Sequence, residues 1–191
     1  RYGSSAASDV YKRQGFISKI GNTVKGFEIG DRVVVTLIKS CGNCNNCLEG
    51  NPTICEASNT AIPPILSSKG ITIQQVMNCG AFAEKVVVDQ SQVVKLNYDL
   101  NFETASLLAC GVITGIGAVV NAAKLRPGQD AVVIGAGGVG LNAIQGARIA
   151  GARRIIAVDT NEDKVVVAKE FGATDCVLAT EKSPWRIAKS L

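Results

Sequence analysis

The stretch from Gln129 to Asp159, QDAVVIGAGGVGLNAIQGARIAGARRIIAVD, limits the possible folds of this chain more than any other. A β-branched, apolar run over residues 131–134 leads directly into glycines, and a second apolar run ends at Asp159. Such runs are typical of parallel strands that are buried on both faces. Between them, Gly151 follows an apolar pattern with helical spacing, made by Leu141, Ile144, Ala147 and Ile149. The pattern predicts a strand, a helix and a second, parallel strand.

The glycines in GAGGVG (residues 135–140) have the spacing of a dinucleotide-binding loop. Gly135 would make the tight turn, Gly137 would let the backbone approach a pyrophosphate, and Gly140 would let helix and strand pack closely. Gly138 lies at the start of the helix, whose free N–H groups favour phosphate. Asp159 follows about twenty residues after Gly140, where an acid accepts hydrogen bonds from the adenosine ribose. Since its charge would repel a 2′-phosphate, we predict NAD rather than NADP. The alternative is a glycine turn that binds nothing.

The chain continues past Asp159 in the same alternating order. Residues 160–174 predict a second helix that starts near Asn161 and stops at Gly172, and DCVLA predicts a third strand. The last residues predict the beginning of another helix. This is the first half of a Rossmann dinucleotide-binding domain.

Four of the seven cysteines form a second motif, KSCGNCNNCLEGNPTIC, with C-x2-C-x2-C-x7-C spacing. Cys41, Cys44, Cys47 and Cys55 could bind one zinc ion through four thiolates. A four-thiolate shell leaves no open coordination position, so the zinc would be structural. A disulfide pair and an iron–sulfur cluster are the alternatives.

Composition excludes several other classes of function. The formal charge is +4 with no basic run longer than two residues, which gives no reason to expect a nucleic acid or an anionic membrane as a partner. The apolar run over residues 107–123 is rich in glycine and alanine and predicts a buried helical segment. The first residues contain no apolar signal-peptide core, so we expect reduced thiols and a cytoplasmic protein. DRVVVTL, GAFAEKVVVDQ and QVVKL predict strands of a mostly β domain around the cysteines.

From Gly15 to about Lys189 the chain resembles the zinc-dependent alcohol dehydrogenases of the medium-chain dehydrogenase/reductase superfamily. The motifs that carry the resemblance are GFISKIGNTVKGFEIGDRVVV, the cysteine quartet, GAFAEKVVV, LLACGVITGIGAV and the glycine loop, in that order. The resemblance implies an α/β chain. Residues 15–100 would form part of a GroES-like catalytic domain with a structural zinc lobe over residues 41–55. Residues 101–191 would form a linking helix and the first half of the Rossmann domain. Residues 1–14 match nothing in the family, and we interpret them as linker-derived translation or an assembly artefact.

The resemblance also implies roles for single residues. Cys110 stands where the family has its last catalytic-zinc ligand, and Thr114 and Val139 would lie near the nicotinamide. Lys164 would bind the adenosine ribose together with Asp159. Without the resemblance, Cys110 would be interpreted as a core thiol and Lys164 as a solvated lysine. The two remaining cysteines, Cys79 and Cys176, match no ligand position and are predicted to be packing residues.

The chain departs from the family at the catalytic zinc. The family's other ligands are a cysteine and a histidine, with a glutamate beside the histidine, and the chain contains no histidine. The resemblance therefore implies a fragment of an enzyme that transfers a hydride from a primary alcohol, or a substrate like S-hydroxymethylglutathione, to NAD. We expect the fragment itself to be inactive and the full-length enzyme to be a homodimer or homotetramer. The alternatives are an aryl-alcohol or polyol dehydrogenase, a zinc-free quinone reductase and a non-catalytic zinc-binding module.

Overall fold

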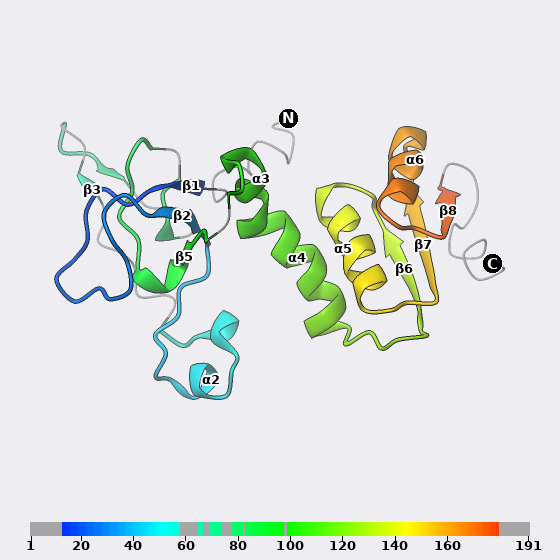
Figure 1. Cartoon of the computed structure of the whole chain (residues 1–191), viewed down its shortest axis with the longest axis horizontal. Helices are drawn as coiled ribbons and strands as arrows, with labels where there is room; N and C mark the ends of the chain where they lie inside the picture. The colour runs from blue at the N-terminus through cyan, green and yellow to red at the C-terminus, as the bar shows by residue number, and fades with distance from the viewer. Residues whose placement is uncertain are drawn as a thin grey trace. The chain divides into compact units, whose positions relative to one another are not determined.

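The computed structural model describes residues 13–57, 65–66, 69–73, 78–81, 83–97 and 99–179. It divides into two compact units, Arg1–Cys110 and Gly111–Leu191 (Figure 1). Most of the predicted leader, and the helix predicted after Ala179, lie outside the described residues. The domain boundary predicted between residues 100 and 101 stays a prediction.

The N-terminal unit contains a three-stranded antiparallel sheet with β2 (Arg32–Val35) between β1 (Arg13–Phe16) and β5 (Val93–Lys95). Val33, Val34 and Val35 are buried because β2 is the central strand. A short hairpin pairs β3 (Ile65–Leu66) with β4 (Thr72–Ile73). The strands predicted from DRVVVTL and QVVKL are therefore confirmed.

The prediction of a strand from GAFAEKVVVDQ is wrong. The described residues 83–89 form no strand, and Val87 is 74% exposed. The end of this segment is a 3-10 turn, η4 (Gln90–Gln92), with Asp89 as its N-cap. Asp89 Oδ1 accepts a hydrogen bond from Ser91 N at 2.9 Å, and Gln92 Oε1 accepts one from Asp89 N at 3.3 Å. This reciprocal capping satisfies the local backbone without a neighbouring strand.

A cluster of aromatic and charged side chains joins α3 (Phe102–Leu107) to this sheet. Phe102 packs edge-to-face on Phe16, with ring centroids 5.2 Å apart. The guanidinium of Arg32 lies 4.8 Å above the Phe102 ring, pairs with Asp99 at 3.3 Å and donates to the Leu100 carbonyl. Because the same arginine holds the ring and the preceding loop, it fixes the point at which the helix begins.

The C-terminal unit is a parallel sheet in the order β6 (Asp130–Ile134), β7 (Arg154–Asp159) and β8 (Asp175–Leu178). The connections are the helices α5 (Gly138–Ile149) and α6 (Glu162–Glu170). This alternating architecture confirms the predicted strand, helix and strand pattern and the α/β class. β6 lies at an edge of the described sheet, with Val132 and Ile134 52% and 82% exposed.

The core of the C-terminal unit confirms part of the predicted apolar face of α5. Ile144 and Ala147 are fully buried against residues of β7, and Leu141 packs beside them. Ile149 was predicted on this face but is 75% exposed. At about 100° per residue, the five positions between Ile144 and Ile149 turn the later side chain well away from the sheet.

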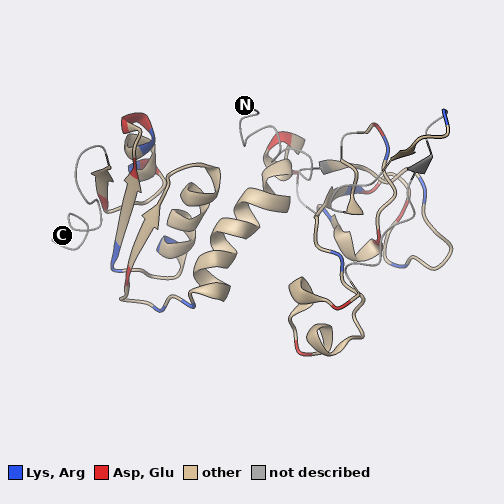
Figure 2. Cartoon of the chain, turned by 180° about the vertical axis from the view of Figure 1, so that it is seen from behind, with Lys and Arg blue, Asp and Glu red and all other residues tan. Residues whose placement is uncertain are grey.

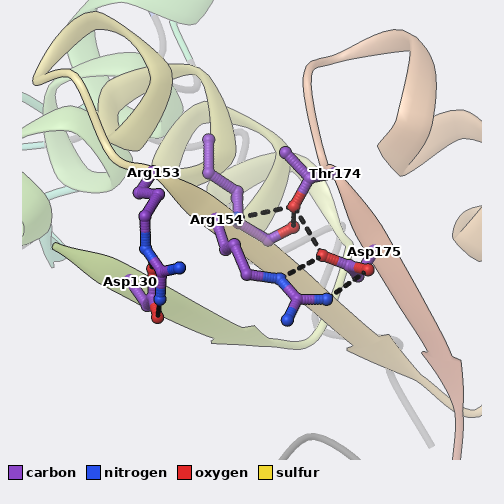
Figure 3. A network of polar contacts seen from close by, with 6 residues as sticks. Asp130, Arg153, Arg154, Thr174 and Asp175 are labelled. Atoms are coloured by element: carbon purple, nitrogen blue, oxygen red, sulfur yellow. Dashed lines mark hydrogen bonds and ion pairs between the residues drawn. The ribbon is translucent and has the colours of Figure 1, made fainter. Parts of the chain in front are cut away.

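Ion pairs link the starts of the three parallel strands (Figure 3). Arg153, just before β7, contacts Asp130 at the start of β6 at 2.5 Å. Arg154 donates to both carboxylate oxygens of Asp175, at 3.0 and 2.8 Å, and Thr174 Oγ1 donates to the same group at 2.7 Å. These hydrogen bonds, first that from Arg154, lower the pKa of Asp175. The pairs lock neighbouring strands in one register at this end of the sheet.

The apolar helical run over Phe102–Ala122 has no charged side chain between Glu103 and Lys124 (Figure 2). By length and composition it could cross a membrane, a test that core helices of soluble proteins also pass. The prediction of a helix is confirmed, but the prediction that it is buried is corrected, since only 22% of its most apolar window is buried. Within the described residues, the buried positions of this run are Ala105, Ala109, Gly115 and Val119.

The end of this helical run offers a test of backbone strain. Lys124 has a φ of +51°, and the next amide, Leu125 N, donates to Val119 O at 3.1 Å, as in a left-handed helix C-cap. We expect Lys124→Gly to raise the free energy of unfolding by about 0.5–1 kcal/mol, because glycine adopts this conformation without strain. Urea unfolding measures the change. Arg126→Gly, two residues later, is the matched control and should destabilise; a loss of stability in Lys124→Gly would contradict the prediction.

Candidate functional site

The four cysteines of the quartet lie around a common centre. All four Sγ atoms lie within 4.8 Å of one another, and the Cys41–Cys47 and Cys44–Cys55 pairs are each 4.0 Å apart. In a tetrahedral site with zinc–sulfur bonds of about 2.3 Å, sulfurs are about 3.8 Å apart. The quartet cysteines carry free thiols, and their 4.0 Å sulfur separations are about twice an S–S bond, which argues against the disulfide alternative. The geometry and chemistry of the quartet fit zinc.

Tight turns and short helices bring these sulfurs together. Gly42 and Gly50 have φ angles of +75° and +83°, which other residues rarely adopt. Between these glycines, α2 (Asn45–Leu48) follows Cys44; after Gly50, the 3-10 turn η2 (Pro52–Ile54) leads into Cys55. Backbone amides point at the sulfurs: Cys44 N donates to Cys41 Sγ, and Cys41 N donates to Cys55 Sγ, each at 3.3 Å.

The electrostatics of the lobe favour thiolates at two of the positions. Backbone N–H groups of Asn43 and Cys44 lower the pKa of Cys41 to about 6, and the N–H of Cys47 lowers the pKa of Cys44. Desolvation raises the pKa of Cys47 to about 11. Cysteine binds metal ions as the thiolate. A bound cation would therefore offset the free-energy cost of deprotonating the remaining cysteines of the quartet.

The second site is the glycine loop between β6 and α5. Gly135 has a φ of +94°, and Gly135 N donates to Val158 O at 2.7 Å, which ties the turn to β7. A Cβ atom at residue 140 would lie 1.8 Å from the Gly135 carbonyl oxygen, so this position requires glycine. By contrast, a Cβ atom at Gly137 or Gly138 would meet nothing within 4 Å, which leaves the backbone open to a ligand.

Asp159 ends β7 beside this loop. Its Oδ2 accepts a hydrogen bond from Ala136 N at 2.7 Å, and its Oδ1 accepts one from Asn161 N at 3.0 Å. These amides, first that of Ala136, and the nearby charge of Lys164 lower the pKa of Asp159, so it is ionised at neutral pH. Sequence reasoning missed the contribution of Ala136, because a backbone donor leaves no signature in residue type.

Two family models match the chain. The alcohol dehydrogenase GroES-like domain matches residues 12–98, and the zinc-binding dehydrogenase model matches residues 138–190. Alcohol dehydrogenase 6 of Peromyscus maniculatus is 39% identical over 170 residues, and S-(hydroxymethyl)glutathione dehydrogenase of Synechocystis sp. is 40% identical over 171. The chain belongs to the zinc-dependent alcohol dehydrogenase family. Each alignment covers 85% of this chain but only 45% and 46% of these relatives, so the chain spans about half of their length.

Solved structures of zinc-dependent alcohol dehydrogenases share the fold. Benzyl alcohol dehydrogenase from Acinetobacter calcoaceticus superposes with a TM-score of 0.83 at 32% identity, over 94% of this chain and 51% of that one. An alcohol dehydrogenase zinc-binding domain protein from Burkholderia ambifaria gives a TM-score of 0.85 at 29% identity, with the same coverage. The expected order of a GroES-like domain followed by a Rossmann-like domain is confirmed.

The other residues expected from this dehydrogenase family belong neither to the quartet nor to the glycines of the loop. Cys110 is half-buried in a π-helical turn, Leu108–Val112, and forms no further metal-binding group with the acidic or cysteine side chains of the described residues. Thr114 is exposed in α4 (Ile113–Gly117), Val139 is half-exposed in the first turn of α5, and Lys164 is exposed in α6. Their roles stay predictions.

Proposed function

We propose that this chain is the zinc-lobe and dinucleotide-loop portion of an NAD-dependent alcohol dehydrogenase that oxidises a primary alcohol. The observation that carries the proposal is the glycine loop with Asp159 beside it, in the same chain as a four-thiolate lobe. A quinone reductase would not need the lobe, and a zinc-binding interaction module would not need the loop. Several relatives are S-(hydroxymethyl)glutathione dehydrogenases, which supports a substrate of that class.

Some of the site residues would have a structural role, and others would bind the dinucleotide. The quartet would hold the structural zinc, and the open backbone at Gly137 and Gly138 would take the pyrophosphate at the start of α5. Asp159 would accept hydrogen bonds from the adenosine ribose, with Lys164 beside it. Cys110 would be the one ligand that this chain offers to a catalytic zinc, and a single thiolate does not hold the ion. A bound nicotinamide would supply the hydride acceptor. Thr114 and Val139 would orient that ring. The family resemblance supports a homodimer or homotetramer. The free thiols of the quartet support a cytoplasmic location.

The choice of NAD over NADP tests the proposal. We expect Asp159→Gly to weaken NAD binding to this chain at least tenfold, because charge-assisted hydrogen bonds of this kind are worth about 1.5–3 kcal/mol each. NADP binding should not fall in parallel, because the charge that opposes its 2′-phosphate is removed. Calorimetric titration with both dinucleotides measures the ratio.

The matched control is Asp163→Gly, which removes an exposed acid from the first turn of α6 without touching the loop. It should leave the ratio of NAD to NADP affinity unchanged. Failure of the wild-type chain to bind NAD, or an unchanged ratio in Asp159→Gly, would refute the proposed dinucleotide site.

A further inference from the structure

The helix α4 lies beside α5 in the C-terminal unit (Figure 1), and the two come into close contact at a glycine. We infer that Gly115 is a positioning residue for the dinucleotide loop, because it lets α4 lie in backbone contact with the first turn of α5. This inference rests on the proposed dinucleotide function. It adds a residue from a neighbouring helix, outside the glycine motif.

Distances at Gly115 show how close the two helices are. A Cβ atom added at residue 115 would lie 2.4 Å from the Val139 carbonyl oxygen and 2.7 Å from Ala143 N. It would also lie 2.7 Å from the Asn142 Cβ atom. Real Cβ atoms essentially never approach other atoms within 3.0 Å, and two of these three neighbours are backbone. No rotamer change can relieve the contact, so the turn itself would have to move.

The same turn of α5 is also held on its other side. Gly140 lies so close to Gly135 that a Cβ atom there would be 1.8 Å from the Gly135 carbonyl. In a close-packed interior, a small displacement of one segment is passed on to the segments that it contacts. A shift of Val139 away from α4 would therefore be transmitted to the glycine loop and to the helix N-terminus that faces the pyrophosphate.

Other glycines near the same helix pair provide matched controls. A Cβ atom at Gly117, two residues later in α4, would meet only Asn121 Nδ2 at 3.8 Å, an ordinary contact. A Cβ atom at Gly146, on the part of α5 remote from the loop, would lie 3.1 Å from Ile116 Cα. Gly117→Ala therefore adds the same methyl group without a clash, whereas Gly146→Ala crowds the same helix pair far from the dinucleotide.

The experiment measures NAD and ADP-ribose affinity of the zinc-loaded, 191-residue chain by calorimetry, with stability from urea unfolding. Gly115→Ala should weaken the binding of both ligands at least tenfold, because displaced loop amides would lose charge-assisted hydrogen bonds to the pyrophosphate. Gly117→Ala should bind as the wild type does. Gly146→Ala should lose stability but keep its affinity, which separates positioning from general destabilisation.

Hydrogen exchange of the amides in residues 138–143 supplies a readout that needs no ligand. Exchange there should rise in Gly115→Ala and stay unchanged in Gly146→Ala. Should Gly115→Ala fail to fold, Asn142→Val branches the side chain at Asn142 Cβ, the side-chain atom that faces Gly115, and should weaken NAD binding as well. Wild-type affinity and exchange in Gly115→Ala, or an equal loss of affinity in Gly146→Ala, would overturn the inference. A wild-type chain that binds neither ligand would instead refute the proposed dinucleotide function.

Discussion

Removal of zinc from the purified chain should unfold the lobe between Cys41 and Cys55. Neither α2 nor η2 contains a buried residue, and Cys55 is the only ligand that is buried, so little apolar packing would hold the lobe without metal. A four-thiolate zinc site can contribute roughly 10 kcal/mol or more to folding. The sheet of β1, β2 and β5 should survive, because its buried valines lie outside the lobe.

Elemental analysis, thiol titration and limited proteolysis would measure these effects. We expect close to one equivalent of zinc and, after chelation, new cleavage within residues 41–55. Cys41→Ser should lose the metal, whereas Cys176→Ser, which changes a thiol of β8, should retain it. A zinc content below a few tenths of an equivalent, or unchanged zinc in Cys41→Ser, would eliminate the quartet as a metal site.

The 191-residue chain should give no detectable alcohol oxidation, whereas a chimera that supplies the missing ligands should be active. A catalytic zinc needs three protein ligands and one open position, and this chain offers only Cys110 at a position that matches the family. The chimera would add the upstream cysteine and histidine and the remainder of the dinucleotide domain from the Synechocystis relative. Ethanol, benzyl alcohol and formaldehyde with glutathione would distinguish the substrate classes through NADH formation.

Cys110→Ala in the active chimera should abolish turnover, while Cys176→Ala should leave most of it. The first change would remove the proposed zinc ligand, and the second removes a thiol that contacts the Val165 carbonyl. NADH formation by the 191-residue chain that disappears in Cys110→Ala would show that the other ligands are dispensable. Full activity of the chimera with Cys110→Ala would show that this cysteine is not a ligand.

The parts of the structure that could be predicted are those specified by neighbouring residues. Gly135, Gly151 and Gly172 all adopt positive φ angles at turns that the sequence indicated, and Asn161 caps α6 as expected. The quartet could be recognised because its spacing alone brings the thiols near one centre. Each of these features depends on backbone preferences or ligand geometry within a few residues.

The features that sequence reasoning missed depend on what lies across from a residue. The valines near Val87 look like a strand, yet no described strand pairs with them, and Ile149 is apolar without facing the core. The closeness of Gly115 to Val139 is likewise invisible in a chain with 20 glycines. Propensity and periodicity describe a single segment, whereas burial and close approach depend on that segment and on the segment packed against it.

The strand order of the C-terminal unit has a consequence for folding during synthesis. β6 pairs with β7, and β7 pairs with β8, so each strand joins its immediate successor through a single helix. Contacts of this local kind form early, and chains fold from the N-terminal side as they leave the ribosome. In the described residues the other edge of β6 carries no strand. A strand that followed β8 in the chain and added to this edge would have to close a longer loop, so its docking would be the slower, later step of assembly.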